Sequence, residues 1–79
     1  MRKILYINYV NKEFKQILTE FLKENNLSQS EFARRIGVKA GLVNDWLRCK
    51  AKPSYDTLRA MSKAFNISAD YFLGLTDEY

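Results

Sequence analysis

The sequence feature that most constrains the fold is a short link between two amphipathic segments, centred on Gly37. Before this link, Ser28 and Glu31 have the spacing of a capping box, in which each side chain hydrogen-bonds to the other residue's backbone N–H. Gly37 is predicted to end that helix, because glycine adopts a positive φ without steric cost. The next helix is predicted to begin near Ala40. Two helices joined by so few residues cross at a steep angle, which leaves the second free to face outward.

Helical periodicity extends over most of the chain and predicts an all-α fold of five short helices. The first is expected over residues 12–24, with Asn11 as its N-cap and residues 25–26 as its end. Ser54 and Ser68 are predicted to cap a fourth helix and a last short one. The apolar positions that these helices carry recur at i, i+3 and i+4, and they are Phe14, Ile17, Leu18, Phe21, Leu22, Phe32, Ala33, Ile36, Val43, Trp46, Leu47, Tyr55, Leu58, Met61, Phe65, Phe72 and Leu73.

The first ten residues differ from the rest, because residues 4–10 are rich in β-branched and aromatic types, which favour a strand. A lone strand leaves backbone hydrogen bonds unmade, so we expect this β arm to pair with the same segment of a second chain. The alternatives are an apolar arm packed across the helices and a frayed terminus. The expected division is therefore an arm over 1–10, a helical domain over 11–76 and a tail over 77–79.

Composition excludes several functions. The chain has no histidine and a single cysteine, Cys49, so we expect no intrachain disulfide, no Cys/His metal site, no cofactor and no enzymatic activity. Cys49 lies between Arg48 and Lys50 and could act as a redox-sensing thiol, but an incidental thiol is the simpler interpretation. We expect neither a signal peptide nor a membrane span, and the lone thiol fits a reducing cytoplasm.

The excess positive charge is concentrated in one stretch. Residues 29–52 contain six basic and two acidic side chains, a net +4 that equals the formal charge of the whole chain. The members of this stretch are Glu31, Arg34, Arg35, Lys39, Asp45, Arg48, Lys50 and Lys52. A local basic stretch on a nearly neutral body is typical of a polyanion-binding surface, although a solvated face alone would explain it as well.

Residues 27–38 (LSQSEFARRIGV) resemble the first half of the lambda-repressor/Cro-type helix-turn-helix, the family also called XRE-like regulators of bacteria and phages. Residues 42–54 resemble the second half, and residues 67–74 are similar to the closing helix of the family. The joint spacing that carries the resemblance is that of Gln29, Ala33, Gly37, Val43, Trp46 and Pro53. The resemblance implies a compact five-helix DNA-binding domain whose third helix, over residues 40–48, enters the major groove.

The resemblance also implies which side chains face DNA. Gln29 matches a position that contacts DNA at the start of the second helix. The outward positions at the start of the recognition helix are Lys39, Ala40, Gly41, Asn44 and Asp45. The positions that meet backbone phosphates at its end and in the following loop are Arg48, Lys50 and Lys52.

The chemistry of these side chains agrees with base and phosphate contacts. Asn44 has the amide that pairs with adenine, Lys39 can donate to guanine or phosphate, and Ala40 can touch a thymine methyl group. Asp45 can accept from cytosine or orient a neighbouring arginine. Gly41 fits either a close approach of the backbone to DNA or a tolerant first turn.

The sequence departs from the family at two helix ends. Lys39 stands where a serine or threonine cap is usual, and Cys49 stands where glycine is common. Ala40 and Gly41 also replace longer polar side chains, so sequence readout is expected to depend partly on DNA shape.

These inferences together predict a sequence-specific regulator of transcription, a repressor acting on double-stranded DNA as a homodimer, with residues 4–10 as one candidate for the dimer contact. It would work at the bacterial nucleoid, or in host cytoplasm if a phage encodes it, and no small-molecule ligand is expected. One alternative is an antitoxin that represses its own operon. Another is a protein-interaction module that recruits a partner through the N-terminal arm.

Overall fold

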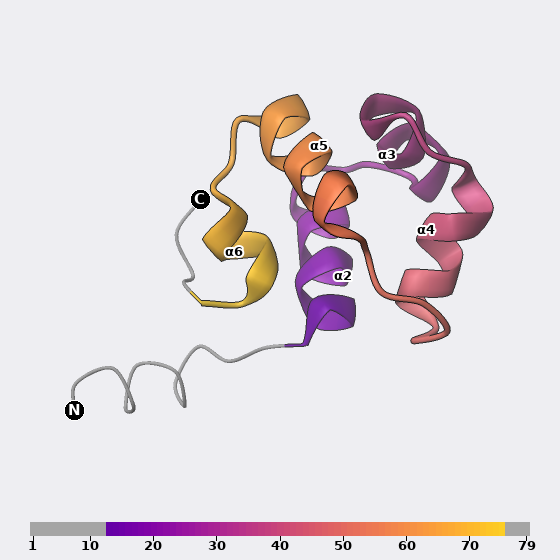
Figure 1. Ribbon diagram of the computed structural model, residues 1–79. Helices are drawn as coiled ribbons and strands as arrows, with labels where there is room; N and C mark the ends of the chain where they lie inside the picture. The colour runs from indigo at the N-terminus through magenta and orange to yellow at the C-terminus, as the bar shows by residue number, and fades with distance from the viewer. Residues whose placement is uncertain (1–12, 76–79) are drawn as a thin grey trace.

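The computed structural model of the chain describes residues 13–75. Within that range it contains five helices, α2 (Phe14–Glu24), α3 (Gln29–Ile36), α4 (Ala40–Leu47), α5 (Tyr55–Phe65) and α6 (Ala69–Leu73). The predicted all-α, five-helix fold is confirmed. Helices α3 and α4 lie together on one side of the molecule and α6 on the other, with α2 and α5 between them (Figure 1). The predicted arm over 1–10 and the tail over 77–79 lie outside the described residues.

Two helix boundaries differ from those predicted. Helix α2 begins at Phe14 instead of residue 12, and its N-cap is Glu13 instead of Asn11, which lies outside the described residues. Glutamate is not among the usual capping residues, and here the Gln16 side chain accepts a 3.4 Å hydrogen bond from the Glu13 N–H. Helix α4 ends at Leu47, one residue before the predicted end, because Arg48 is already its C-cap.

The core is built around rings. Phe21 of α2 lies edge-on to Phe32 of α3, Phe65 of α5 and Phe72 of α6, with centroids 5.1 to 6.0 Å apart. Such edge-to-face pairs are the favoured aromatic geometry. One side chain of α2 therefore contacts three other helices, which fixes α2 as the centre of the molecule. Met61, which is fully buried, belongs to the same core.

All five described helices end in the same way. The residue that follows the last turn has a left-handed backbone, with φ between 54° and 81°, at Asn26, Gly37, Cys49, Asn66 and Gly74. The amide of the next residue donates back across the turn to a carbonyl five residues earlier, at 2.8 to 3.1 Å. This is the 6→1 bond of the Schellman motif, which satisfies carbonyls that the helix leaves free. The chain changes direction at each of these turns. Apart from residues 48–54, the links between the described helices are therefore short.

Three of the helices begin as predicted. Ser28, Ser54 and Ser68 each accept a hydrogen bond from the backbone N–H three residues later, at 3.0 to 3.3 Å. The Glu31 carboxylate in turn accepts a 3.0 Å hydrogen bond from the Ser28 N–H, which completes the capping box. None of the described helices combines the length and the apolar character needed to cross a lipid bilayer.

Candidate nucleic-acid interface

The turn between α3 and α4 sets the direction of the recognition helix. Gly37 has φ 81° and ψ 30°, and the amides of Gly37 and Val38 donate to Arg34 and Ala33 at 3.3 and 2.9 Å. A side chain at Gly37 would strain this left-handed backbone. The chain then re-enters a helix at Ala40, and α4 packs more extensively against α3 than against any other helix.

Two side chains hold α4 against the body. Val43 and Trp46, one turn apart, are 0 % and 2 % exposed. The Trp46 ring lies edge-on to Phe14 of α2, with centroids 5.9 Å apart. The indole N–H of Trp46 is buried without a hydrogen-bond partner in the described part of the chain. Apolar packing therefore anchors α4, as the sequence predicted for Val43 and Trp46.

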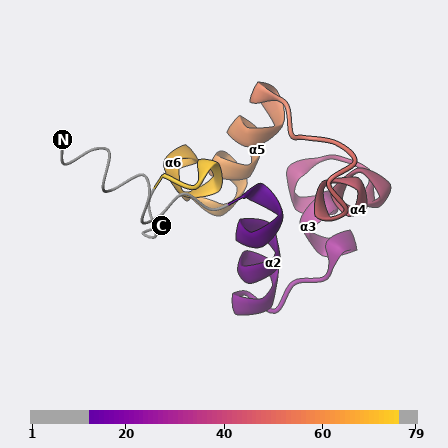
Figure 2. The same ribbon diagram turned by 90° about the horizontal axis from the view of Figure 1, so that it is seen from below.

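The side of α4 that faces away from Val43 and Trp46 carries predicted DNA-facing positions. In a helix of 3.6 residues per turn, residues 41, 44, 45 and 48 fall opposite these two side chains, and residue 40 falls at the edge of that face. Ala40, Gly41 and Arg48 are exposed, and Asn44 and Asp45 are partly buried. The structure therefore brings five of the nine predicted site residues together on α4, four along one stripe and Ala40 at its edge. Figure 2 shows α4 at the edge of the molecule, beside α3.

The N-terminus of α4 has no side-chain cap. Lys39 is its N-cap, and its side chain accepts no capping hydrogen bond, as expected from the departure noted in the sequence. The first amides of α4 therefore lack a side-chain partner. A Cβ at Gly41 would meet nothing within 4 Å, so protein packing does not require glycine there. Lys39 itself is exposed.

Gln29 lies at the N-terminus of α3, which Ser28 caps. It is the first residue of the helix, it is exposed, and it directly follows the Ser28 cap. The hydrogen bond from the Ser28 N–H is the main reason that the pKa of Glu31 lies below its ordinary value of 4.5, with smaller contributions from the Ser28 hydroxyl and from Arg34 and Arg35. A helix N-terminus attracts phosphate through its free amides and its dipole.

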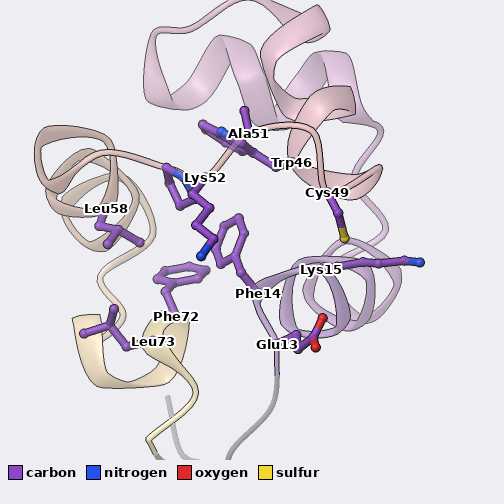
Figure 3. A pocket seen from close by; sticks show the side chains of 11 residues that line it. Glu13, Phe14, Lys15, Trp46, Cys49, Ala51, Lys52, Leu58, Phe72 and Leu73 are labelled. Carbon is purple, nitrogen blue, oxygen red and sulfur yellow. The ribbon is translucent and has the colours of Figure 1, made fainter.

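The basic stretch divides into separate groups in three dimensions. Arg48 and Lys50, at the end of α4, are exposed. Lys52, a predicted phosphate contact, is exposed and extends across an apolar groove towards the rings of Phe14 and Phe72 (Figure 3). The guanidinium of Arg35 lies 4.6 Å from the ring centroid of Phe65, as a cation–π pair. Sequence spacing gave no sign of either contact, because both depend on packing between distant helices.

Cys49 lies in the turn that ends α4, at the position where glycine is common in the family. Its thiol is free and exposed, and its backbone has φ 61°, a conformation that is strained for a residue with a Cβ. Within residues 13–75 no three histidine, cysteine or carboxylate side chains gather closely enough to hold a metal ion.

Comparison with known families bears on this arrangement of a packed α3, a sharp turn and an outward-facing α4. A model of the helix-turn-helix family matches residues 18–72, which span all five described helices except the ends of α2 and α6. The chain belongs to the lambda-repressor/Cro-type helix-turn-helix family. Members of this helix-turn-helix family bind double-stranded DNA.

One relative carries a functional name. The helix-turn-helix chain is 30 % identical over 63 residues to a Bacillus subtilis (strain 168) protein described as an uncharacterized HTH-type transcriptional regulator, YobD. The match covers 80 % of this chain and 56 % of the relative, so the chain corresponds to little more than half of that protein. No solved structure matches the chain.

Proposed function

We propose that this chain is a sequence-specific transcriptional regulator, a repressor that binds double-stranded DNA as a dimer with α4 in the major groove. The observation that carries the proposal is the outward stripe of α4, which holds Asn44 and Arg48 opposite the buried Val43 and Trp46. The name of the Bacillus relative supports a role in transcription. As a regulator of transcription it would act at the bacterial nucleoid, or in the host cytoplasm if a phage encodes it.

Each proposed contact has a distinct role. Asn44 and Asp45 read base edges, and Lys39 and Ala40 approach the groove from the start of α4. Gln29, Arg48, Lys50 and Lys52 position the protein on backbone phosphates. In a dimer the two copies of α4 would occupy successive major grooves about 34 Å apart, the distance of one helical turn.

Selection from random duplex DNA tests the proposal. The protein is incubated with the pool at about 150 mM salt, near physiological ionic strength, and the bound DNA is sequenced. We expect an enriched palindrome whose half-sites are separated by one helical turn. Binding without sequence enrichment would contradict sequence-specific regulation, and no binding at all would favour the protein-interaction module instead.

Paired substitutions separate base reading from phosphate contact. We expect Asn44→Ala to lower the preference for the selected operator over a scrambled duplex, because a paired amide contributes about 1–3 kcal/mol of base discrimination. We expect Lys50→Ala to weaken binding to both duplexes by the same factor, because phosphates carry no sequence information. The measurement is a fluorescence-anisotropy titration of each variant against both duplexes.

Lys63→Ala is the matched control, since Lys63 is an exposed lysine in the last turn of α5. Its loss changes the net charge as Lys50→Ala does, but removes no proposed contact. If Asn44→Ala weakens both duplexes equally, Asn44 does not read bases. If Lys63→Ala weakens binding as much as Lys50→Ala, only the overall charge of the protein matters.

A further inference from the structure

An apolar groove lies on the side of the molecule where α2 begins and α4 ends. It has a volume of about 620 Å³, and its apolar lining comes from α2, α4, α5, α6 and the loop before α5. The rings of Phe14, Trp46 and Phe72 and the side chains of Leu58 and Leu73 face it (Figure 3). Leu73 is 49 % exposed, a large value for a leucine at the end of a packed helix. An apolar concavity of this size is typical of a surface that binds another group.

We propose that the occupant of this groove is the apolar run of the chain's own N-terminal segment, residues 4–10. The docked run would cover Leu73 and Phe14 and pack against the end of α4. This interaction competes with the pairing of the same residues as a strand between two chains, which the sequence also allows. Dimerisation would then use a different surface.

Connectivity is the first argument. Glu13, the first described residue, itself lines the groove, so the N-terminal segment is joined to the groove at its edge. Val10 lies three positions before Glu13 in the chain, and an extended chain spans about 3.3–3.6 Å per residue, so about 10 Å of chain connects Val10 to the edge of the groove. A tethered ligand of this kind binds at an effective concentration in the millimolar range. A second copy of the chain has no such advantage at ordinary protein concentrations.

The pattern of the segment is the second argument. In an extended conformation alternate side chains share a face, so Leu5, Ile7 and Tyr9 would form one wholly apolar row. The other row, Ile4, Tyr6, Asn8 and Val10, is interrupted by the polar Asn8. The uninterrupted row is therefore the one that fits a groove lined by rings and leucines.

Charge does not oppose the docking. The basic residues of the segment, Arg2, Lys3 and Lys12, flank the apolar run and would remain outside the groove. Lys52 extends over the groove on a flexible four-carbon stem (Figure 3), and such a stem can turn its ammonium group back to water. No buried charge has to be moved, since none of the buried side chains in the described residues is charged.

The single cysteine allows a direct test in the full chain. Cys49 lines the groove and is exposed, so a nitroxide spin label attached there broadens amide signals close to the groove. In ¹⁵N-labelled protein we expect the amides of residues 4–10 to lose most of their intensity, and to recover it when the nitroxide is reduced. Unchanged intensities at residues 4–10 would overturn the proposal.

A mixed sample distinguishes the chain's own segment from that of a second copy. Chains without ¹⁵N that carry the nitroxide at Cys49 are mixed with ¹⁵N-labelled Cys49→Ser chains, which cannot carry it. We expect no intensity loss at residues 4–10 in this mixture. Loss in the mixture equal to that in the first sample would identify a second copy as the occupant and overturn docking within one chain.

Substitution provides a readout that does not depend on the spin label. We expect Ile7→Asp to increase the rate at which iodoacetamide alkylates Cys49 several-fold, because the docked segment no longer shields the groove. Asn8→Asp, which adds the same charge on the other row, should leave the rate unchanged. On the groove side Leu73→Gln should act as Ile7→Asp does, whereas Leu75→Gln should not, since Leu75 is exposed but does not line the groove. Equal rates in all four variants and the parent protein would contradict the proposal.

Discussion

Left-handed backbone ends the five described helices, at two glycines, two asparagines and one cysteine. Glycine adopts this conformation freely, and asparagine tolerates it because its short polar side chain can hydrogen-bond locally. Cys49 has neither property. Its φ of 61° is maintained by the turn itself, in which the Lys50 N–H donates to the Asp45 carbonyl at 2.8 Å. The end of the recognition helix is therefore a point of local backbone strain.

Replacing Cys49 with glycine should stabilise the protein. The left-handed conformation costs a residue with a Cβ about 1–2 kcal/mol, and the greater unfolded-state freedom of glycine offsets part of the gain. We expect a net increase of about 1 kcal/mol in the free energy of unfolding, or about 4–8 °C in Tm for a domain of this size. Thermal denaturation followed by circular dichroism measures it. Cys49→Ala is the control, since it keeps the Cβ and should bring no such gain; a lower Tm for the glycine variant would show that the thiol itself contributes to packing.

Gly41→Ala separates two explanations for a glycine in α4. The space around Gly41 is open, so alanine should raise the free energy of unfolding by up to about 1 kcal/mol through its higher helix propensity. We expect DNA affinity to fall despite this gain, because the added methyl group would stand between α4 and the duplex. Chemical denaturation and an operator titration measure the two effects. Unchanged affinity would mean that glycine is merely tolerated in the first turn.

At the scale of helices, capping chemistry explains which boundaries the sequence could predict. Ser28, Ser54 and Ser68 mark helix starts because a hydroxyl at this position accepts an N–H bond whatever surrounds it. The start of α2 was wrong by two residues because Glu13 is not a usual capping residue and a better candidate, Asn11, was nearby. A helix boundary could therefore be predicted where its capping hydrogen bonds join residues that are close together in the sequence.

The candidate site shows the same limit. The family resemblance supplied the predicted DNA-facing positions of α4, and helical periodicity places Gly41, Asn44, Asp45 and Arg48 opposite its buried side. The direction of Lys52 over the groove could not be predicted, because it depends on where α2 and α6 place Phe14 and Phe72. The left-handed backbone at Cys49 had only an indirect sign, the usual glycine of the family.

The capping box of α3 makes its stability depend on pH. The Ser28 N–H binds the Glu31 carboxylate and lowers its pKa in the folded protein below the ordinary value of 4.5. A group with a lowered folded pKa stabilises the fold at pH values above its unfolded pKa, and this stabilisation is lost as the pH falls through the folded pKa.

We therefore expect the stabilisation from Glu31 to be fully present near neutral pH and to decline as the pH falls below about 4.5, the ordinary pKa of the group. In Glu31→Gln this part of the pH dependence should disappear, because the amide still accepts a hydrogen bond but does not titrate in this range. Urea denaturation of both proteins between about pH 3 and pH 7 measures the difference. Parallel stability curves across this range would show that Glu31 makes no net contribution.

For the whole molecule, folding distributes the continuous basic stretch of sequence over several parts of the surface. Arg35 lies against Phe65 and Lys52 extends over the groove, whereas Arg48 and Lys50 lie at the end of α4. All four side chains are exposed, so the proposed phosphate contacts of Arg48, Lys50 and Lys52 are accessible to DNA.

The proposed phosphate contacts predict that the affinity for DNA falls as the salt concentration rises. Each neutralised phosphate contributes about −0.9 to the slope of log K against log salt concentration. We expect Lys50→Ala to make the slope less negative by about 0.9 per bound protomer, and Lys63→Ala to leave it unchanged. Titrations between about 50 and 200 mM salt measure both slopes. A slope that is unaffected by Lys50→Ala would remove Lys50 from the phosphate contacts.

The connections between the described helices also differ in how much change they tolerate. Residues 25–28, 37–39 and 66–68 are short links in which one left-handed residue sets the path of the next helix, so an inserted residue would redirect a packed element. Residues 48–54 form the longest link. The entropic cost of closing a flexible surface loop rises only slowly with its length. During evolution, insertions and deletions can therefore accumulate between α4 and α5 while the core stays intact. Because Lys50 and Lys52 lie in this link, such changes could alter the proposed phosphate contacts while the sequence of the recognition helix stays the same.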